Sequence, residues 1–185
     1  MDAIEALISR RSAAMLTEPG PSKEDAEILV KAAMRAPDHC NLKPWRFLFI
    51  EGEARNALGD IFAEALEKRE PETTSAALEK ARGKPLRAPL IIAVIAKVQM
   101  HSKVPEVEQL LSAGAAAQNI MVAAHAMGYA GIWRTGKPCF DNHVKTALGA
   151  SKNDQIVGFL YLGTAIRTPA VREEPIAKFA EIWKG

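Results

Sequence analysis

The chain has 185 residues, a formal net charge of +2 and only two cysteines, which suits a single domain, residues 1–185, with a buried core. So small a charge argues against nucleic-acid binding, two cysteines are too few for a disulfide framework, and the acidic N-terminus is unlike a signal peptide. Because no apolar run reaches the roughly 18 residues that span a bilayer, we expect a cytoplasmic protein without a membrane or nucleic-acid partner.

Apolar periodicity in the first half of the chain predicts mostly helices. In chain order we expect a helix over 2–10, a turn over 17–21, a helix from 22 to about 35, a strand over 45–50, and helices over 53–70 and 74–82. Ile4, Leu7 and Ile8 are expected to form the buried face of the first helix. The region 53–85 has the highest charge and the weakest apolar pattern, so we interpret it as a helical excursion and a candidate lid.

The second half combines buried strands with one long helix. We expect a strand over 89–96 buried on both faces, a helix over about 106–127, a strand over 129–133, a turn over 134–138, a helix over 141–148 and a strand over 155–162. The long helix is apolar almost all round, and one small domain rarely covers such a helix completely, so we predict a dimer. The tail after residue 163 is expected to wrap over the surface or over a partner.

This order of elements predicts an α+β fold. We expect an α/β sandwich in which a small mixed β-sheet is flanked by helices, with the long buried central helix at a dimer interface. Most predicted strands are separated by helices, which is why a mixed sheet is expected.

Several common active-site motifs are absent. The sequence has neither a glycine-rich dinucleotide fingerprint, nor a phosphate-binding P-loop, nor a nucleophile elbow. The four histidines lie far apart, so no metal site is predicted. We expect His125 to be a core histidine with a backbone partner. Cys40 beside His39 is a weak candidate nucleophile, because adjacent loop residues usually point apart.

Three groups of cationic and polar residues remain, each at the edge of an apolar element: Arg10-Arg11-Ser12, Arg35 with His39 and Asn41, and Trp133-Arg134-Thr135-Gly136. The second group lies in a loop that Pro37 and Pro44 should stiffen. Arginines bind phosphate bidentately, and glycine permits close approach of a ligand to backbone amides. A planar ligand that carries a phosphate would need this combination, although for each arginine taken alone a solvated charge is the better interpretation.

The order and spacing of several short motifs add a resemblance over nearly the whole chain. They are Arg10-Arg11-Ser12, residues 34–39, Pro44-Trp45, and residues 103–105, 112–114, 131–134 and 156–163. In these motifs the chain resembles the FMN-dependent nitroreductase family, in particular its compact bacterial subgroup. The resemblance departs at Thr135, where serine is usual, and at His39 and Lys43, which make the pocket more cationic than in larger relatives.

The resemblance implies a homodimer with two FMN sites at the subunit interface. It assigns the FMN phosphate and ribityl chain to Arg10, Arg11 and Ser12, and a contribution from the other subunit to Arg35, His39 and Asn41. A wall of the site is assigned to Trp133, Arg134 and Thr135, with the backbone amide of Thr135 or Gly136 near flavin N5. Gly163 and Arg167 are further candidates for the phosphate pocket. The segment Ala123, Ala124, His125, Ala126, Met127 and Gly128 resembles the stretch assigned to NAD(P).

The implied activity is transfer of a hydride from NAD(P)H through FMN N5 to a nitroaromatic, a quinone or a similar small-molecule acceptor. No side chain need act as a nucleophile. Arg35 and Lys43 are candidates for stabilising negative charge on the reduced flavin. The alternative interpretation is a flavin-binding carrier or sensor module without robust turnover. The sequence leaves open the acceptor and the choice between NADH and NADPH.

Overall fold

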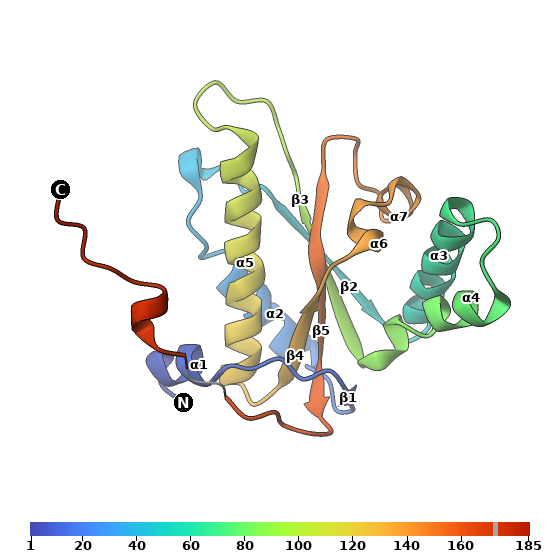
Figure 1. Ribbon diagram of the computed structural model, residues 1–185, viewed down its shortest axis with the longest axis horizontal. Helices are drawn as coiled ribbons and strands as arrows, with labels where there is room; N and C mark the ends of the chain where they lie inside the picture. The colour runs from blue at the N-terminus through green and yellow to red at the C-terminus, as the bar shows by residue number, and fades with distance from the viewer. Residues whose placement is uncertain (172–173) are drawn as a thin grey trace.

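A five-stranded β-sheet separates two layers of helices in the computed structural model, which describes residues 1–171 and 174–185 (Figure 1). The strands are β1 (Leu16–Thr17), β2 (Trp45–Glu51), β3 (Leu90–Ala96), β4 (Ala130–Arg134) and β5 (Gln155–Ala165). They follow the order β1-β5-β3-β2, and β4 also pairs with β5. The α+β fold with a small sheet flanked by helices is confirmed.

All named strands pair antiparallel, whereas a mixed sheet was expected. Among the described residues, parallel pairing is limited to an isolated bridge between Ser12 and Gly131. The helices between β2 and β3 do not make a parallel crossover, because α3 (Ala54–Arg69) and α4 (Ser75–Arg82) pack on each other and return the chain to the same sheet end. Glu51 at the end of β2 therefore pairs with Leu90 at the start of β3.

Several helices begin at a residue whose side chain caps them. On one side of the sheet lie α1 (Ala3–Ser9), α2 (Lys23–Ala33) and α5 (Glu106–Ala126); on the other lie α3, α6 (Lys137–Phe140) and α7 (Asn142–Ala147) (Figure 1). Single 3₁₀ turns are η1 (His39–Asn41), η2 (Pro85–Arg87) and η3 (Ile176–Lys178). Ser22 and Asp25 form the capping box of α2, and the Asp141 side chain accepts hydrogen bonds from two amides of α7.

The central strand β3 is the core of the molecule, as predicted. All seven of its residues are buried. Leu90, Ile92 and Val94 pack against α2 and α5, whereas Ile91 and Ile95 pack against the opposite helical layer. A strand with both faces covered alternates between two cores, and each fully buried aliphatic side chain contributes about 1.5–3 kcal/mol.

Two apolar surfaces that were expected to be covered lie open in a single chain. Ile4 and Ile8 of α1 are more than half exposed, so this helix does not bury its expected face within one chain. Along α5, Ala113 and Ala117 are buried, but Leu111 is two-thirds exposed. The helix is therefore covered on one side only. No helix of the described part is long and apolar enough to cross a membrane.

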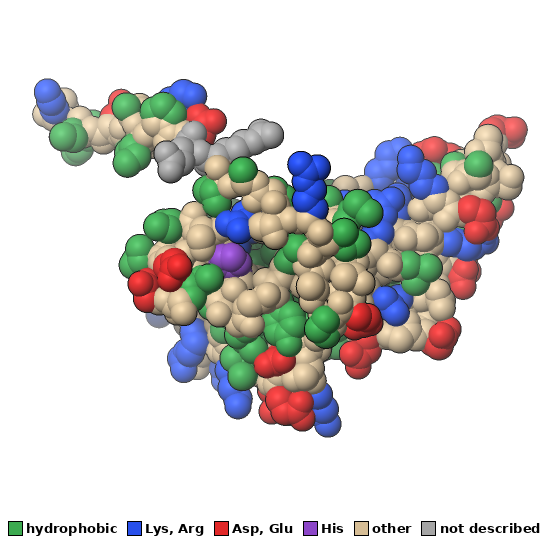
Figure 2. All heavy atoms as spheres, turned by 90° about the horizontal axis from the view of Figure 1, so that it is seen from below, with side chains coloured by type: hydrophobic (Ala, Val, Ile, Leu, Met, Phe, Trp, Pro, Cys, Tyr) green, Lys and Arg blue, Asp and Glu red, His purple; other side chains and the backbone are tan. Residues whose placement is uncertain are grey.

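The C-terminal tail also differs from expectation. The predicted last strand extends to Ala165, and the predicted turn over 17–21 begins within β1, which pairs with this extension. Beyond residue 173 the tail lies apart from the helices and the sheet, with apolar side chains along it (Figures 1 and 2). Phe179, Ile182 and Trp183 are each more than three-quarters exposed. The tail covers no face of its own chain there.

Candidate active site

Two of the three predicted residue groups lie side by side along one strand. Ser12 bridges Gly131 in parallel, and the Ala13 amide donates to the Gly131 carbonyl at 3.0 Å. Further along, Arg134 Nη2 donates to the Ala14 carbonyl at 3.2 Å. The segment 10–14 thus runs beside β4, a contact between residues about 120 positions apart. We call this part of the molecule, residues 10–14 with β4 and the following turn, the β4 edge.

Two arginines of the β4 edge carry hydrogen-bond donors that have no acceptor within the described residues. Arg11 Nη1 donates to the Ser9 carbonyl at 3.2 Å, and the Arg134 guanidinium lies 5.3 Å from the centre of the Tyr161 ring. Nε of Arg11 and Nε of Arg134 are both buried, and neither has a hydrogen-bond partner within the described residues. A buried donor without an acceptor is costly, so both arginines suit a ligand that offers acceptors.

A cavity of about 300 Å³ opens where β4 ends. Its lining combines the aromatic rings of Trp133, Phe159 and Tyr161 with the cations Lys84, Arg87 and Arg134. An adjoining cavity of about 340 Å³ shares Thr135 and extends to Gly136. No carboxylate lines the first cavity in the described structure. An aromatic, cationic cavity of this kind suits a planar anionic ligand.

Lys84 and Arg87 were missed by sequence reasoning. Burial lowers the pKa of Lys84, and the nearby Arg87 and Arg69 lower it further. Burial raises the pKa of Tyr161 to about 12, against the opposing effect of Arg134 and Arg87. The available signal was the position of Lys84 at the start of η2 and of Arg87 at its end, directly before the most buried strand. Lys84 fell in the region 53–85, which was interpreted only as a lid, and Arg87 fell just beyond it.

Glycines shape the wall and the turn of this cavity. Trp133 Nε1 donates to the Val157 carbonyl at 3.3 Å. A Cβ atom at Gly158 would lie 2.1 Å from that nitrogen, so only glycine leaves room for the indole ring. Gly136 has φ = 94°, which favours glycine, and a Cβ there would meet nothing within 4 Å. The turn after β4 is therefore open to a ligand.

The loop residues of the third predicted group lie near the opposite end of α5. His39 Nδ1 is 2.6 Å from Glu108 Oε2 in the first turn of α5, whereas Ser9 Oγ, next to the β4 edge, lies 2.8 Å from His125 Nε2 in the last turn. The 17 positions between Glu108 and His125 correspond to about 25 Å of helix. Within one chain, His39 and the loop residue Asn41 therefore do not join the β4 edge. Arg35 lies closer to the middle of α5, because Asn119 of that helix donates to the carbonyl of nearby Ala32 at 3.1 Å.

The loop that carries this third group is fixed by its own hydrogen bonds. The Asp38 carboxylate accepts from the amides of Leu42 and Lys43, at 3.1 and 2.7 Å. Cys40, Asn41 and Lys43 all have positive φ, between 50° and 60°. Cys40 is exposed, while burial raises the pKa of the Cys139 thiol to about 12, which makes Cys139 a poor nucleophile. Within the described residues there is no cluster of three metal-ligating side chains.

The proposed NAD(P) segment lies at the C-terminal end of α5. A cavity of about 310 Å³ there is lined by Arg11, His125 and Gly128, among others. Ala124 is only 1% exposed and its side chain belongs to the core, so it does not line this cavity. Because α1 packs here, the partner of His125 is the Ser9 hydroxyl and not the expected backbone group. Burial lowers the pKa of His125, and Arg11 and Arg10 add to this.

Gly163, a candidate for the phosphate pocket, serves packing. A Cβ there would lie 2.7 Å from the Pro89 ring and 2.8 Å from the Thr17 carbonyl. The glycine thus allows close contact of β5 with β1 and with the start of β3. Arg167 lies exposed just beyond β5.

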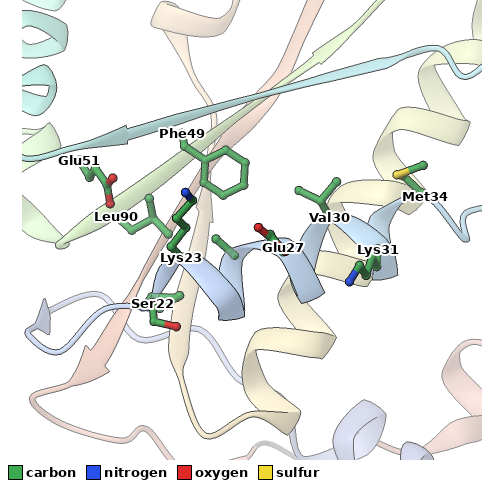
Figure 3. A pocket seen from close by; sticks show the side chains of 11 residues that line it. Ser22, Lys23, Glu27, Val30, Lys31, Met34, Phe49, Glu51 and Leu90 are labelled. Atoms are coloured by element: carbon green, nitrogen blue, oxygen red, sulfur yellow. The ribbon is translucent and has the colours of Figure 1, made fainter.

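A larger cavity, about 740 Å³, lies elsewhere. It lies between α2 and the edge strand β2 and is lined by apolar side chains that include Val30, Met34 and Phe49, with Lys23 and Glu27 at its side (Figure 3). None of the predicted site residues lines it. Size alone therefore does not identify the active site of this molecule.

Comparison with known proteins gives a consistent result. A model described as the nitroreductase family matches residues 7–164. The chain is 48% identical over 166 residues to the Escherichia coli protein named "Putative NAD(P)H nitroreductase YdjA", covering 89% of this chain and 88% of the relative. It is 36% identical over 167 residues to a Haemophilus influenzae protein named "Putative NAD(P)H nitroreductase", covering 90% of each chain.

Solved structures share the fold at lower identity. A nitroreductase-like family protein from Bacillus cereus superposes with a TM-score of 0.85 at 23% identity, covering 100% of this chain and 97% of the other. A mutant of the FMN and NADPH-dependent nitroreductase NfnB, from sphigopyxis sp. strain HMH, gives a TM-score of 0.76 at 20% identity, with 100% of both chains covered.

Proposed function

Because the chain belongs to the nitroreductase family and is an oxidoreductase, we propose that it is an FMN enzyme that transfers electrons from NAD(P)H to a nitroaromatic, a quinone or a similar acceptor. The observation that carries this proposal is the unbalanced positive charge of the β4 edge and its cavity. Within the described residues, two buried guanidinium nitrogens, of Arg11 and Arg134, have no partner there. Lys84, Arg87 and Arg134 line the cavity at the end of β4, and its described lining contains no carboxylate. A flavin phosphate and ring would supply the missing acceptors.

The residues fit FMN as follows. Arg10, Arg11 and Ser12 would hold the phosphate and ribityl chain, and Trp133, Arg134 and Thr135 would line the ring. The open turn at Gly136 would present backbone amides to the ring edge, because no side chain obstructs them. Bound FMN would supply hydride transfer through its N5 atom.

The chain's own cations would stabilise negative charge on the reduced cofactor. Arg35 and Lys43 were the candidates from sequence, but Lys43 lies in the loop at the other end of α5 and Arg35 follows the end of α2; both would act from the second chain. Lys84 and Arg87 line the cavity next to Thr135, so we add them to this role. Burial and the nearby Arg87 lower the pKa of Lys84, and an anionic ring beside it would favour its charged form.

We propose that the active protein is a homodimer of single-domain chains, with two shared FMN sites. In this arrangement Arg35, His39 and Asn41 contribute to the site of the second chain. His39 can reach a ligand on the β4 edge only from there, since about 25 Å of helix separates it from that edge within one chain. A partner helix packed antiparallel against α5 would bring the opposite ends together. The exposed Leu111 of α5 and the exposed apolar residues of α1 and the tail are the surfaces available for that contact.

The NAD(P) assignment to Ala123–Gly128 is proposed in a reduced form. Arg11 and His125 line the same cavity as Gly128, which gives the segment a cationic neighbour that the sequence pattern did not show. The side chain of the core residue Ala124 would not contact NAD(P), so this residue would contribute only through its backbone. A cytoplasmic location and a lid role of residues 53–85 also remain proposals.

The absorbance spectrum of the purified protein tests the assignment. We expect a flavin spectrum that NADH or NADPH bleaches and that an added quinone restores. A protein that holds flavin but is bleached by neither nicotinamide would be a carrier or sensor instead.

Sedimentation of the same holoprotein tests the assembly. We expect about twice the chain mass of 20.1 kDa. A monomer that retains its full FMN content would contradict the shared site.

A further inference from the structure

The loop at the N-terminal end of α5 holds a strained backbone in place. Cys40, Asn41 and Lys43 adopt left-handed φ values although none of them is glycine. Such conformations persist only where the surroundings enforce them, and they cluster at functional sites. Here the Asp38 carboxylate binds two amides of the loop, and Gln99 Nε2 donates to the Leu42 carbonyl at 3.4 Å.

The side chain that this loop positions is His39. Its Nδ1 contacts Glu108 Oε2 at 2.6 Å. Glu108 lies in the first turn of α5, where the helix dipole favours a carboxylate. With Nδ1 engaged by a carboxylate, the proton on that nitrogen is fixed, and Nε2 is the ring nitrogen left to exchange a proton with a ligand. The Nε2 atom has no hydrogen-bond partner among the described residues.

Stability does not explain this arrangement. The His39 and Glu108 side chains are 51% and 43% exposed, and an ion pair so exposed contributes little to the folded state. The strained backbone of this loop costs free energy in the folded state, and the weak surface ion pair does not offset that cost. Accurate placement of the imidazole ring explains both the strain and the short contact.

We propose that His39 is the proton donor to the electron acceptor and that Glu108 is its positioning residue. This inference rests on the proposed function, in which His39 reaches the flavin site of the second chain. Conversion of a quinone to its quinol requires a hydride and one proton. The Nε2–H bond of the His39 imidazolium breaks, an O–H bond forms on the quinone oxygen that the hydride does not reach, and neutral His39 regains a proton from water.

The test compares two acceptors on the same holoenzyme. The protein is reduced anaerobically with dithionite, so the assay does not depend on NADH or NADPH, and is then mixed with p-benzoquinone or with ferricyanide, which accepts electrons without a proton. For His39→Gln we expect reoxidation by saturating quinone to slow by about 100-fold and reoxidation by ferricyanide to remain unchanged. Equal rates of quinone reduction by the variant and the wild type would overturn the proton-donor role.

Glu108→Gln should show the same selectivity at smaller size, about 10-fold with quinone. Glu106→Gln is the matched control, since it removes an exposed carboxylate from the same helical turn, and we expect it to behave as wild type. Equal slowing of both acceptors in Glu108→Gln would indicate a merely structural contribution and would contradict positioning.

A second measurement needs no turnover. Ring ¹⁵N NMR of histidine-labelled protein should show neutral His39 with its proton on Nδ1, and Glu108→Gln should shift the population towards the Nε2-protonated tautomer. The His39→Gln spectrum assigns the signal. An unchanged tautomer would refute the role of Glu108. Failure of the proposed function would appear separately, as a wild-type flavin that neither nicotinamide bleaches.

Discussion

The two ends of α5 carry two unlike halves of the candidate active site. At the C-terminal end, the β4 edge is held by sheet pairing and burial, with Ser12 bridged to Gly131 and Trp133 seated on Gly158. At the N-terminal end, the loop around His39 is held by local side-chain bonds and strained backbone. The first half depends on contacts between distant parts of the chain, and the second on a few neighbouring residues.

This difference affects what a substitution will do. Changes at the β4 edge should act through packing and so alter the stability of the whole chain. Changes in the loop should leave the core intact and act on function or association. A loss of global stability from a loop substitution, or unchanged stability after a substitution at the β4 edge, would contradict this distinction.

The largest expected effect is at Gly158. A Cβ atom would lie 2.1 Å from Trp133 Nε1 and 3.1 Å from the Arg134 carbonyl, so Gly158→Ala must displace β4 or the indole. Overpacking of this kind should destabilise the fold by about 3 kcal/mol, a fall in Tm of roughly 10 °C. Thermal unfolding measured by circular dichroism would show it. Gly83→Ala is the control: a Cβ there makes ordinary contacts at 3.5 Å, so its Tm should stay near wild type.

The next effect concerns acid stability near the loop. Asp154 is 2% exposed and its Oδ2 lies 2.5 Å from Lys97 Nζ, while the Lys97 amide donates to the Pro44 carbonyl at the loop exit. Burial alone would raise the pKa of Asp154, but hydrogen bonds from Lys97 and Ser151 outweigh it and the pKa is lowered.

A lowered pKa in the folded state means that the stabilisation is complete above the unfolded value of about 4. It is lost as pH falls through the folded pKa. Asp154→Asn should therefore cost about 2 kcal/mol at pH 7 and should flatten the loss of stability below pH 4. Urea unfolding at several pH values would measure both. An equally steep acid transition in the variant would contradict the assignment.

Lys84→Met separates cofactor binding from folding. The substitution removes a cation that burial and nearby Arg87 and Arg69 already disfavour, so the apoprotein should keep its Tm or gain slightly. FMN should bind about 10-fold more weakly, since one charge-assisted interaction is lost. Fluorescence titration of apoprotein with FMN gives the Kd. The control is Lys80→Met on exposed α4, which should bind FMN as the wild type does. Equal FMN affinities of the two variants would show that Lys84 does not contribute to FMN binding.

The smallest expected effect is on the candidate lid. The end of α3 is joined to α6 and α7 by surface ion pairs, among them Glu64 Oε2 with His143 Nε2 at 2.7 Å and Arg69 Nη1 with Asp141 Oδ2 at 3.0 Å. Glu64→Gln should cost only about 0.5 kcal/mol. Hydrogen exchange should nevertheless rise in α3 and α4 more than in β3. A uniform rise across the chain would argue that the helices are not a separately mobile unit.

The sequence by itself determined the longer elements, because these depend on local spacing. The periodicity located β3, α3, α4 and α5 closely. It also identified the residue groups of the β4 edge and the stiff loop, since arginine, proline and glycine restrict chemistry and backbone at the position where they stand.

Only the tertiary structure decided which groups meet. Strand direction could not be read from the helices between strands, because α3 and α4 fold back on each other and leave β2 and β3 antiparallel. Lys84 and Arg87 line the same cavity as the end of β4, a proximity that no local pattern encodes. The separation of His39 from Ser12 follows from the length of α5. Local preference acts over a few residues, whereas these contacts join positions up to 120 residues apart.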